Sequence, residues 1–163
     1  MLQAEIAKLR SNCISRQVGC IVVKENRQIA TGYNGTPAGL TNCFEGGCAR
    51  CMDRQKGLIK SGDKLERCLC THAEANAIMQ CALFGIGSTT KGSTLYSTYS
   101  PCLECSKMVI SVGITRVVSL ASYPEDGTEI LRKAAVVTLK IKESDLFSWF
   151  NFLNRRVEFD SAL

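Results

Sequence analysis

The stretch Cys68-Leu-Cys-Thr-His-Ala-Glu-Ala-Asn-Ala-Ile78 contains the only histidine of the 163-residue chain. The alanines that follow His72 favour a helix over Thr71–Phe84, with the threonine as its N-cap and Gly85 as its stop. Glu74 follows the histidine by two residues, and the chain also holds ten cysteines. A histidine at a helix start among so many thiols is a candidate metal ligand.

A second helix start lies about thirty residues downstream, at Ser100-Pro-Cys-Leu-Glu-Cys105. The serine suits the N-cap and the proline the first helical position, and the helix should end near Gly113. Cys102 and Cys105 are three residues apart, so they share one helical face in a first turn that favours thiolates. One imidazole and two thiolates are the ligands of a catalytic zinc, which keeps its fourth position for water.

Glu74 has two interpretations. Thr71-His-Ala-Glu74 fits a capping box, in which the glutamate folds back onto the N-cap amide. That interpretation is the better one in isolation, but it leaves Pro-Cys-x-x-Cys unexplained. The combined pattern H-x-E…P-C-x-x-C is the signature of zinc-dependent nucleobase deaminases. We therefore predict that His72, Cys102 and Cys105 hold a zinc ion and that Glu74 transfers protons.

Three segments extend the resemblance. Gly32-Tyr-Asn-Gly-Thr-Pro37, His72–Ile78 and Thr94–Cys105 resemble the deoxycytidylate (dCMP) deaminase family, and the similarity runs from about Cys13 to about Leu139. The resemblance implies a three-layer α/β/α cytidine deaminase-like fold, with a central mixed sheet of about five strands. It also implies hydrolytic deamination of dCMP to dUMP for dTMP synthesis, a hexamer, and regulation by dCTP and dTTP, with Mg²⁺ accompanying a triphosphate effector.

The resemblance also implies roles for single residues. A zinc-activated water would attack C4 of the pyrimidine, while Glu74 takes its proton and protonates N3 and the leaving amine. Asn34 would bond the sugar or phosphate, Ala73 would line the substrate site, and Tyr123 would lie near the phosphate. Asn76 would either reach the same pocket or bond the neighbouring loop. No arginine or lysine can be assigned to the phosphate.

A long segment at about residues 36–70 shows no lasting periodicity, which is unusual unless a loop is functional or tied down. Its thiols have zinc-ligand spacing; they are Cys43, Cys48, Cys51, Cys68 and Cys70. We predict that four of them form a second, closed structural zinc site, which gives two zinc ions per chain. The alternative is a set of ordinary reduced thiols. Cys13, Cys20 and Cys81 lie in apolar settings and are expected to be small core residues.

The remaining patterns predict a single α/β domain over 1–163, with helices around one sheet. Further helices are expected at 1–12, 126–135 and 143–153. Strands are expected at 18–23, 28–31, 93–98, 114–120 and 136–141, with a turn at 24–27 and irregular structure from Gly32.

Composition narrows the function. The net charge is +5 and the basic residues are scattered, which favours a solvated surface over a nucleic-acid groove. No apolar run is long enough to span a bilayer, and no signal peptide is evident, so we expect a cytoplasmic protein with a nucleotide partner. Alternatives are deamination of dCTP, cytidine, a purine or a base in single-stranded nucleic acid, or a non-catalytic zinc module. Trp149 is the one tryptophan, and Glu74 argues against a purely structural site.

Overall fold

The computed structural model describes residues 1–123 and 127–157, with side chains up to residue 152. A five-stranded mixed sheet in the order β2-β1-β3-β4-β5 forms its centre. β1 is antiparallel to β2 and β3, whereas β3, β4 and β5 are parallel. The strands are β1 Gly19–Lys24, β2 Arg27–Tyr33, β3 Thr94–Tyr99, β4 Arg116–Ala121 and β5 Val137–Lys140.

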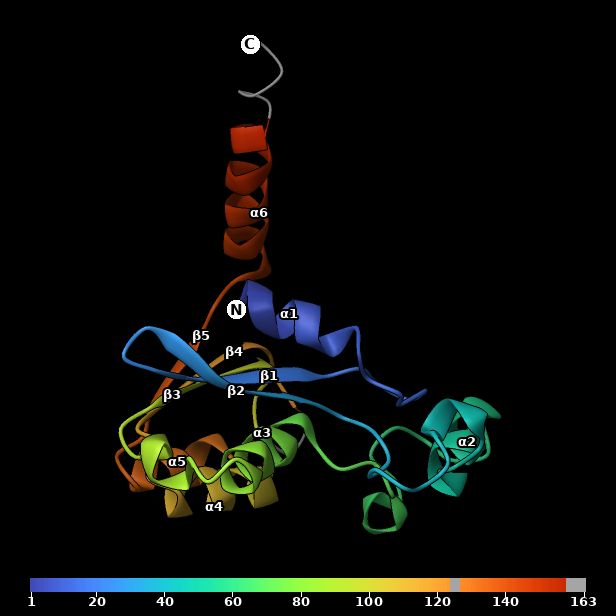
Figure 1. Cartoon of the computed structure of the whole chain (residues 1–163). Coiled ribbons are helices and arrows are strands. Elements are labelled where there is room, and N and C mark those ends of the chain that lie inside the picture. The colour runs from blue at the N-terminus through green and yellow to red at the C-terminus, as the bar shows by residue number, and fades with distance from the viewer. Residues whose placement is uncertain (124–126, 158–163) are drawn as a thin grey trace.

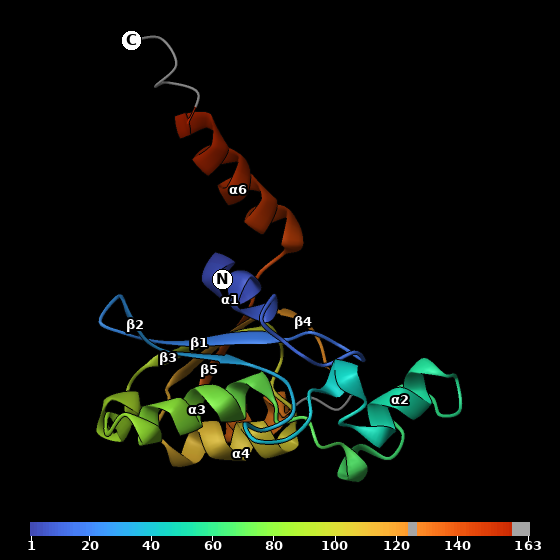
Figure 2. The ribbon, with the colours of Figure 1, turned by 45° about the vertical axis from the view of Figure 1, so that its right-hand side comes forward.

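Helices cover both faces of the sheet, which confirms the predicted three-layer fold. Figure 1 and Figure 2 show α1 on one face and α3, α4 and α5 on the other, while α6 projects from the sheet and α2 lies to one side. No helix in the described part of the chain is long and apolar enough to cross a membrane. The helices are α1 Leu2–Lys8, α2 Ala49–Gln55, α3 Ala73–Leu83, α4 Leu103–Ser111, α5 Thr128–Lys133 and α6 Glu143–Val157.

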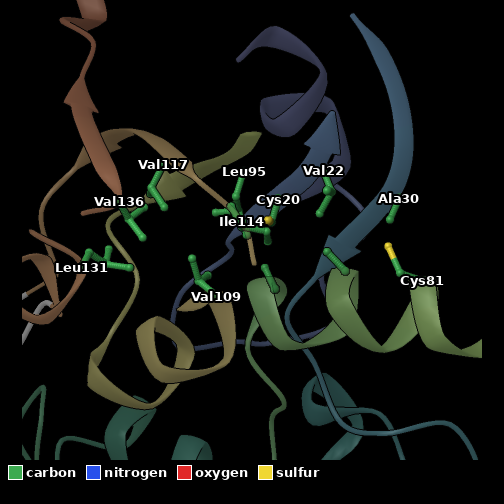
Figure 3. Packing of buried hydrophobic residues seen from close by; sticks show 12 residues of the cluster. Cys20, Val22, Ala30, Cys81, Leu95, Val109, Ile114, Val117, Leu131 and Val136 are labelled. Carbon is green, nitrogen blue, oxygen red and sulfur yellow. The ribbon is translucent and has the colours of Figure 1, made fainter. Parts of the chain in front are cut away.

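The main core lies between the sheet and the α3–α4–α5 layer (Figure 3). β-branched and leucine side chains of the strands face small residues of α3, where the alanines allow close approach. Cys20 and Cys81 are fully buried in this cluster, as expected for small apolar residues. Fully burying a side chain such as Leu95 contributes about 1.5–3 kcal/mol. This core holds α3 and α4 against the sheet and thereby fixes the positions of their first turns.

Both helix starts differ from the prediction. The N-cap of α3 is His72 and that of α4 is Cys102. Thr71 is not helical, because its backbone exchanges two hydrogen bonds with Gly35. Ser100 stays extended, because its amide donates to the carbonyl of Ala121 at 2.8 Å. Long-range backbone pairing therefore overrides the local capping signal.

Other boundaries were wrong by a few residues. α1 ends at Lys8, and β2 continues through Gly32 and Tyr33, where irregular structure was expected. The expected turn is present, with Glu25 and Asn26 both at positive φ. The helix predicted at 126–135 corresponds to α5, and its predicted start at residue 126 lies outside the described residues. The α2 helix was missed altogether.

Gly32 permits the close approach of β2 to α3. An added Cβ would overlap the carbonyl oxygen of Ala73 and the amide nitrogen of Ala77. We expect Gly32→Ala to lower the free energy of unfolding by about 1–3 kcal/mol or more. Thermal melting should show a fall of about 2–12 °C. Gly87→Ala is the control, since its added Cβ meets no atom within 4 Å; equal melting of the two variants would contradict this packing.

Candidate metal centre and adjoining cleft

The three predicted zinc ligands lie together at the starts of α3 and α4. His72 Nδ1 is 3.4 Å from Cys102 Sγ and 3.5 Å from Cys105 Sγ. These atoms lie within 4.8 Å of one another. The hydrogen bond between the Cys105 and Cys102 thiols lowers the pKa of Cys102 to about 4 and raises the pKa of Cys105. The hydrogen bond between His72 and Cys102 raises the pKa of the imidazole. One imidazole and two thiolates at this spacing fit a zinc ion with one position left for water.

Glu74 is directed into the protein beside these ligands. Its side chain is buried, and its Oε1 accepts a hydrogen bond of 2.7 Å from Ser97 Oγ on β3. Since His72 is the N-cap, Glu74 stands at the second helical position, and the capping-box interpretation is wrong. Burial raises the pKa of the Glu74 carboxyl. A buried carboxyl with a raised pKa next to a metal site is suited to proton transfer.

A small cavity lies directly over Glu74 and His72. Ala73, Tyr99 and Ser100 contribute to its wall. It adjoins a larger cleft, and the two share lining residues: Val18, Asn34, His72 and Tyr123. A bound small molecule can therefore place one end at the candidate metal-binding residues and its other end in the cleft.

Two arginines that sequence reasoning did not assign line the larger cleft. Arg50 is buried and donates twice to the carbonyl oxygen of Asp63, at 3.0 and 2.8 Å. Arg54 Nη1 donates to the carbonyl oxygen of Ser15 at 2.8 Å. Their spacing in the sequence carries no signal of this convergence, because the fold of residues 36–70 brings them to the cleft.

Arg16 is the third arginine of the cleft. Its contact with Tyr123 connects it to His72. Its guanidinium carbon lies 4.9 Å from the ring centroid of Tyr99 and 5.6 Å from that of Tyr123. The Tyr123 ring in turn lies 6.2 Å from that of His72. Within residues 1–123 and 127–152, none of the three arginines forms an ion pair with a carboxylate. Three cations without carboxylate partners make the cleft suited to an anion.

The remaining predicted substrate contacts differ in their positions. Asn34 lines both the cavity and the cleft, but its Oδ1 accepts from Ser11 and Val18 and its Nδ2 donates to the carbonyl of Arg16. Ala73 is fully buried in the cavity wall. Asn76 donates to the carbonyl of Tyr33 at 2.7 Å and lines neither cavity nor cleft. Its contact is the loop-bonding role that the sequence left open.

The five other predicted thiols also converge, and a sixth joins them. Cys13, expected in the core, lies instead with this group, 3.9 Å from the sulfur of Cys51. Cys68 Sγ lies 4.0 Å from Cys48 Sγ and 3.9 Å from Cys51 Sγ. The six-thiol cluster comprises Cys13, Cys43, Cys48, Cys51, Cys68 and Cys70. Four of its members also line the arginine cleft.

Sequence comparisons connect these features to known proteins. Residues 1–121 match the family model of the cytidine and deoxycytidylate deaminase zinc-binding region. The chain is 45% identical over 140 residues to the deoxycytidylate deaminase of Saccharomyces cerevisiae, covering 83% of this chain and 41% of that protein. It is 39% identical over 127 residues to the deoxycytidylate deaminase of Mycobacterium phage D29, covering 76% and 89%. The chain spans less than half the length of its two yeast relatives.

Solved structures give the same connection. The dCMP deaminase of cyanophage S-TIM5 in complex with dCMP and dUMP superposes with a TM-score of 0.67. Its identity is 34%, over 86% of this chain and 92% of that one. The diaminohydroxyphosphoribosylaminopyrimidine deaminase/5-amino-6-(5-phosphoribosylamino)uracil reductase from Thermotoga maritima has a TM-score of 0.56 at 24% identity. That match covers 84% of this chain and 33% of the Thermotoga chain. The similarity to the Thermotoga structure supports only the fold of this chain.

Proposed function

The chain belongs to the cytidine and deoxycytidylate deaminase family, and from that premise we propose that it deaminates dCMP to dUMP with release of ammonia. One observation carries the choice of substrate: the cavity at the metal ligands adjoins a cleft with three arginines that form no ion pair with a carboxylate in the described part of the chain. A pyrimidine in the cavity would extend its 5′-phosphate into that cleft. The cyanophage relative solved with dCMP and dUMP supports the same choice.

The reaction needs a metal and a proton carrier. His72, Cys102 and Cys105 would hold a zinc ion, which when bound lowers the pKa of its water to about 7. Glu74 lies beside these ligands and would take one proton of that water and deliver it to N3 of the ring. It would then take the remaining proton from the hydroxyl at C4 and give it to the departing amine, which leaves as ammonia. The Ser97 hydroxyl fixes the carboxylate in place through its 2.7 Å hydrogen bond.

The other groups would orient the nucleotide. Tyr123 lies between the His72 ring and the Arg16 guanidinium, where sugar and phosphate would pass. Asn34 would use the Nδ2 hydrogen that does not bond Arg16, since its Oδ1 already accepts from two donors. Arg16, Arg50 and Arg54 would bind the phosphate, because guanidinium groups match its oxygens in charge and geometry.

Ammonia release from a panel of substrates tests the proposal. We expect kcat/KM for dCMP to exceed that for deoxycytidine, cytidine and a cytosine-containing oligonucleotide by orders of magnitude, because only a nucleotide with a free 5′-phosphate can use the arginines. The rate of ammonia release from dCTP shows whether the cleft also accepts a triphosphate. Comparable rates on the oligonucleotide would favour a nucleic-acid deaminase, and no release from any substrate would favour a non-catalytic zinc module.

The assembly and regulation that the family resemblance implies stay predictions. They are a hexamer, dCTP and dTTP as effectors with Mg²⁺ on the triphosphate, and a cytoplasmic location. Sedimentation with and without dCTP, followed by the same activity assay, would check the first two.

A further inference from the structure

The six-thiol cluster contains two sets of four cysteines. One set is Cys13, Cys43, Cys51 and Cys70, and the other is Cys48, Cys51, Cys68 and Cys70. In each set the four sulfurs lie within 4.8 Å of one another. Cys51 and Cys70 belong to both sets, so six sulfurs supply eight ligand positions. A single zinc would use four of these thiols and leave the other two without a role.

The sulfur spacing within each set matches one metal ion. Four sulfurs around a zinc at about 2.3 Å form a tetrahedron whose edges are about 3.8 Å. Cys51 Sγ lies 3.9 Å from Cys13 Sγ in the first set and 3.9 Å from Cys68 Sγ in the second. We propose that the cluster binds two zinc ions, bridged by the sulfurs of Cys51 and Cys70, in addition to the zinc at His72.

Backbone amides are directed at the terminal thiols. The Leu69 amide donates to Cys48 Sγ at 3.4 Å, and the Cys70 amide donates to Cys68. On the opposite side of the cluster, amides of residues 14–16 donate to Cys13 and Cys43. Backbone N–H donors of this kind orient cysteine sulfurs that ligate metals. Each of the four terminal sulfurs therefore has the backbone hydrogen bond that a metal-bound cysteine commonly accepts.

The segment 36–70, here called the cysteine lobe, has no other core. Its buried residues are four cysteines and Arg50. Four of its large apolar side chains are exposed, and three more are only half-buried. The exposed ones are Leu40, Phe44, Leu58 and Leu69, and the half-buried ones are Met52, Ile59 and Leu65. Apart from the thiols themselves, Ile14 is the hydrophobic side chain packed against the cluster. A lobe without a hydrophobic core depends on metal coordination to stay folded, as small zinc domains do.

Charge and ligand chemistry favour zinc over an iron–sulfur cluster. Six thiols release six protons on binding two Zn²⁺ ions, which leaves a net charge of about −2. The three arginines of the adjoining cleft offset this charge. In a [4Fe–4S] cluster each cysteine ligates a different iron, and in a [2Fe–2S] cluster inorganic sulfide separates two pairs of cysteines. Here the sulfurs are in mutual contact, as ligands of shared all-thiolate metals would be.

Metal content of the wild-type chain is the first test, and it does not depend on activity. Protein purified under reducing conditions should contain about three zinc ions per chain, one at His72 and two in the cluster. About two would mean a single zinc in the cluster and would overturn the proposal. Iron with acid-labile sulfide, or one zinc with all six cluster thiols free, would overturn it as well.

A pair of cysteine variants tests which thiols are involved. Cys13→Ala should lose at least one zinc ion per chain and lower the melting temperature, because Cys13 completes the first set. Cys81→Ala is the matched control: Cys81 is equally a buried thiol but lies in the main core, so its zinc content should stay at about three. Unchanged zinc in Cys13→Ala would remove this residue from the site and the proposal with it.

The bridge itself is tested by exchange of zinc for ¹¹³Cd. Two cadmium ions that share sulfurs should give two resonances coupled to each other through Cys51 and Cys70. A third, uncoupled resonance should come from the site at His72, and it should disappear selectively in His72→Ala. Three uncoupled resonances would exclude shared thiolates. Because these readouts need no substrate, failure of the deaminase assay would leave them intact, and their failure would leave the deaminase proposal intact.

Discussion

Glu74→Gln is expected to lower kcat for dCMP by about 10²–10⁴, toward the larger value, since one carboxyl serves several proton transfers. Glutamine has the same shape but cannot accept the proton of water. The zinc should stay bound, because His72, Cys102 and Cys105 are unchanged. Ammonia release, zinc content and melting temperature should be measured on the same preparation.

Stability should be equal or slightly higher in this variant. The glutamine Oε1 can still accept from Ser97 Oγ, and a neutral amide costs less to bury than a carboxylate. No cap is lost, because Glu74 does not cap α3. A lowered melting temperature with near-normal kcat would therefore contradict the assigned role.

Glu104→Gln provides the matched control. Glu104 lies in the first turn of α4, between the two cysteine ligands, yet it is exposed and pairs with Lys107. An exposed pair of this kind contributes little to stability. If Glu104→Gln lost activity as severely as Glu74→Gln, the loss would reflect disturbance of the α4 start and not the missing proton carrier.

The elements of the fold could be predicted wherever local pattern and tertiary packing agree. The β-branched run of β1, the turn at Glu25–Asn26 and the alanine-rich α3 are examples. The helix starts could not be predicted, because Thr71 and Ser100 are good N-caps whose backbones are bonded elsewhere. The α2 helix was invisible for another reason: it buries Arg50 and Cys51, and thus has no apolar stripe.

The same division applies to the site. The candidate metal ligands and Glu74 lie in two short motifs with informative spacing, so their convergence could be predicted from the sequence. Cys13 could not be assigned, since Ile14 and the strand beyond suggest a core position and only the folded lobe brings its sulfur to Cys51. The cleft arginines come from two distant segments and carry no motif at all.

Arg16→Gln should show whether the arginine cleft confers the preference for a nucleotide. Among the three arginines, Arg16 is the one stacked on Tyr99 and Tyr123, next to the metal ligands. Hydrogen bonds to a charged group contribute about 1.5–3 kcal/mol, so kcat/KM for dCMP should fall roughly 10- to 150-fold. Deoxycytidine has no phosphate, and its kcat/KM should change little.

The ratio of the two substrates is the decisive readout, because a general loss of folded enzyme lowers both rates equally. Arg67→Gln is the control: it removes a nearby exposed arginine that pairs weakly with Glu66 and does not line the cleft. Its dCMP-to-deoxycytidine ratio should match that of the wild type. Unchanged rates on both substrates in Arg16→Gln would assign the phosphate to Arg50 and Arg54. A parallel fall on both substrates, at an unchanged melting temperature, would instead mean that Arg16 acts by holding the tyrosines beside His72.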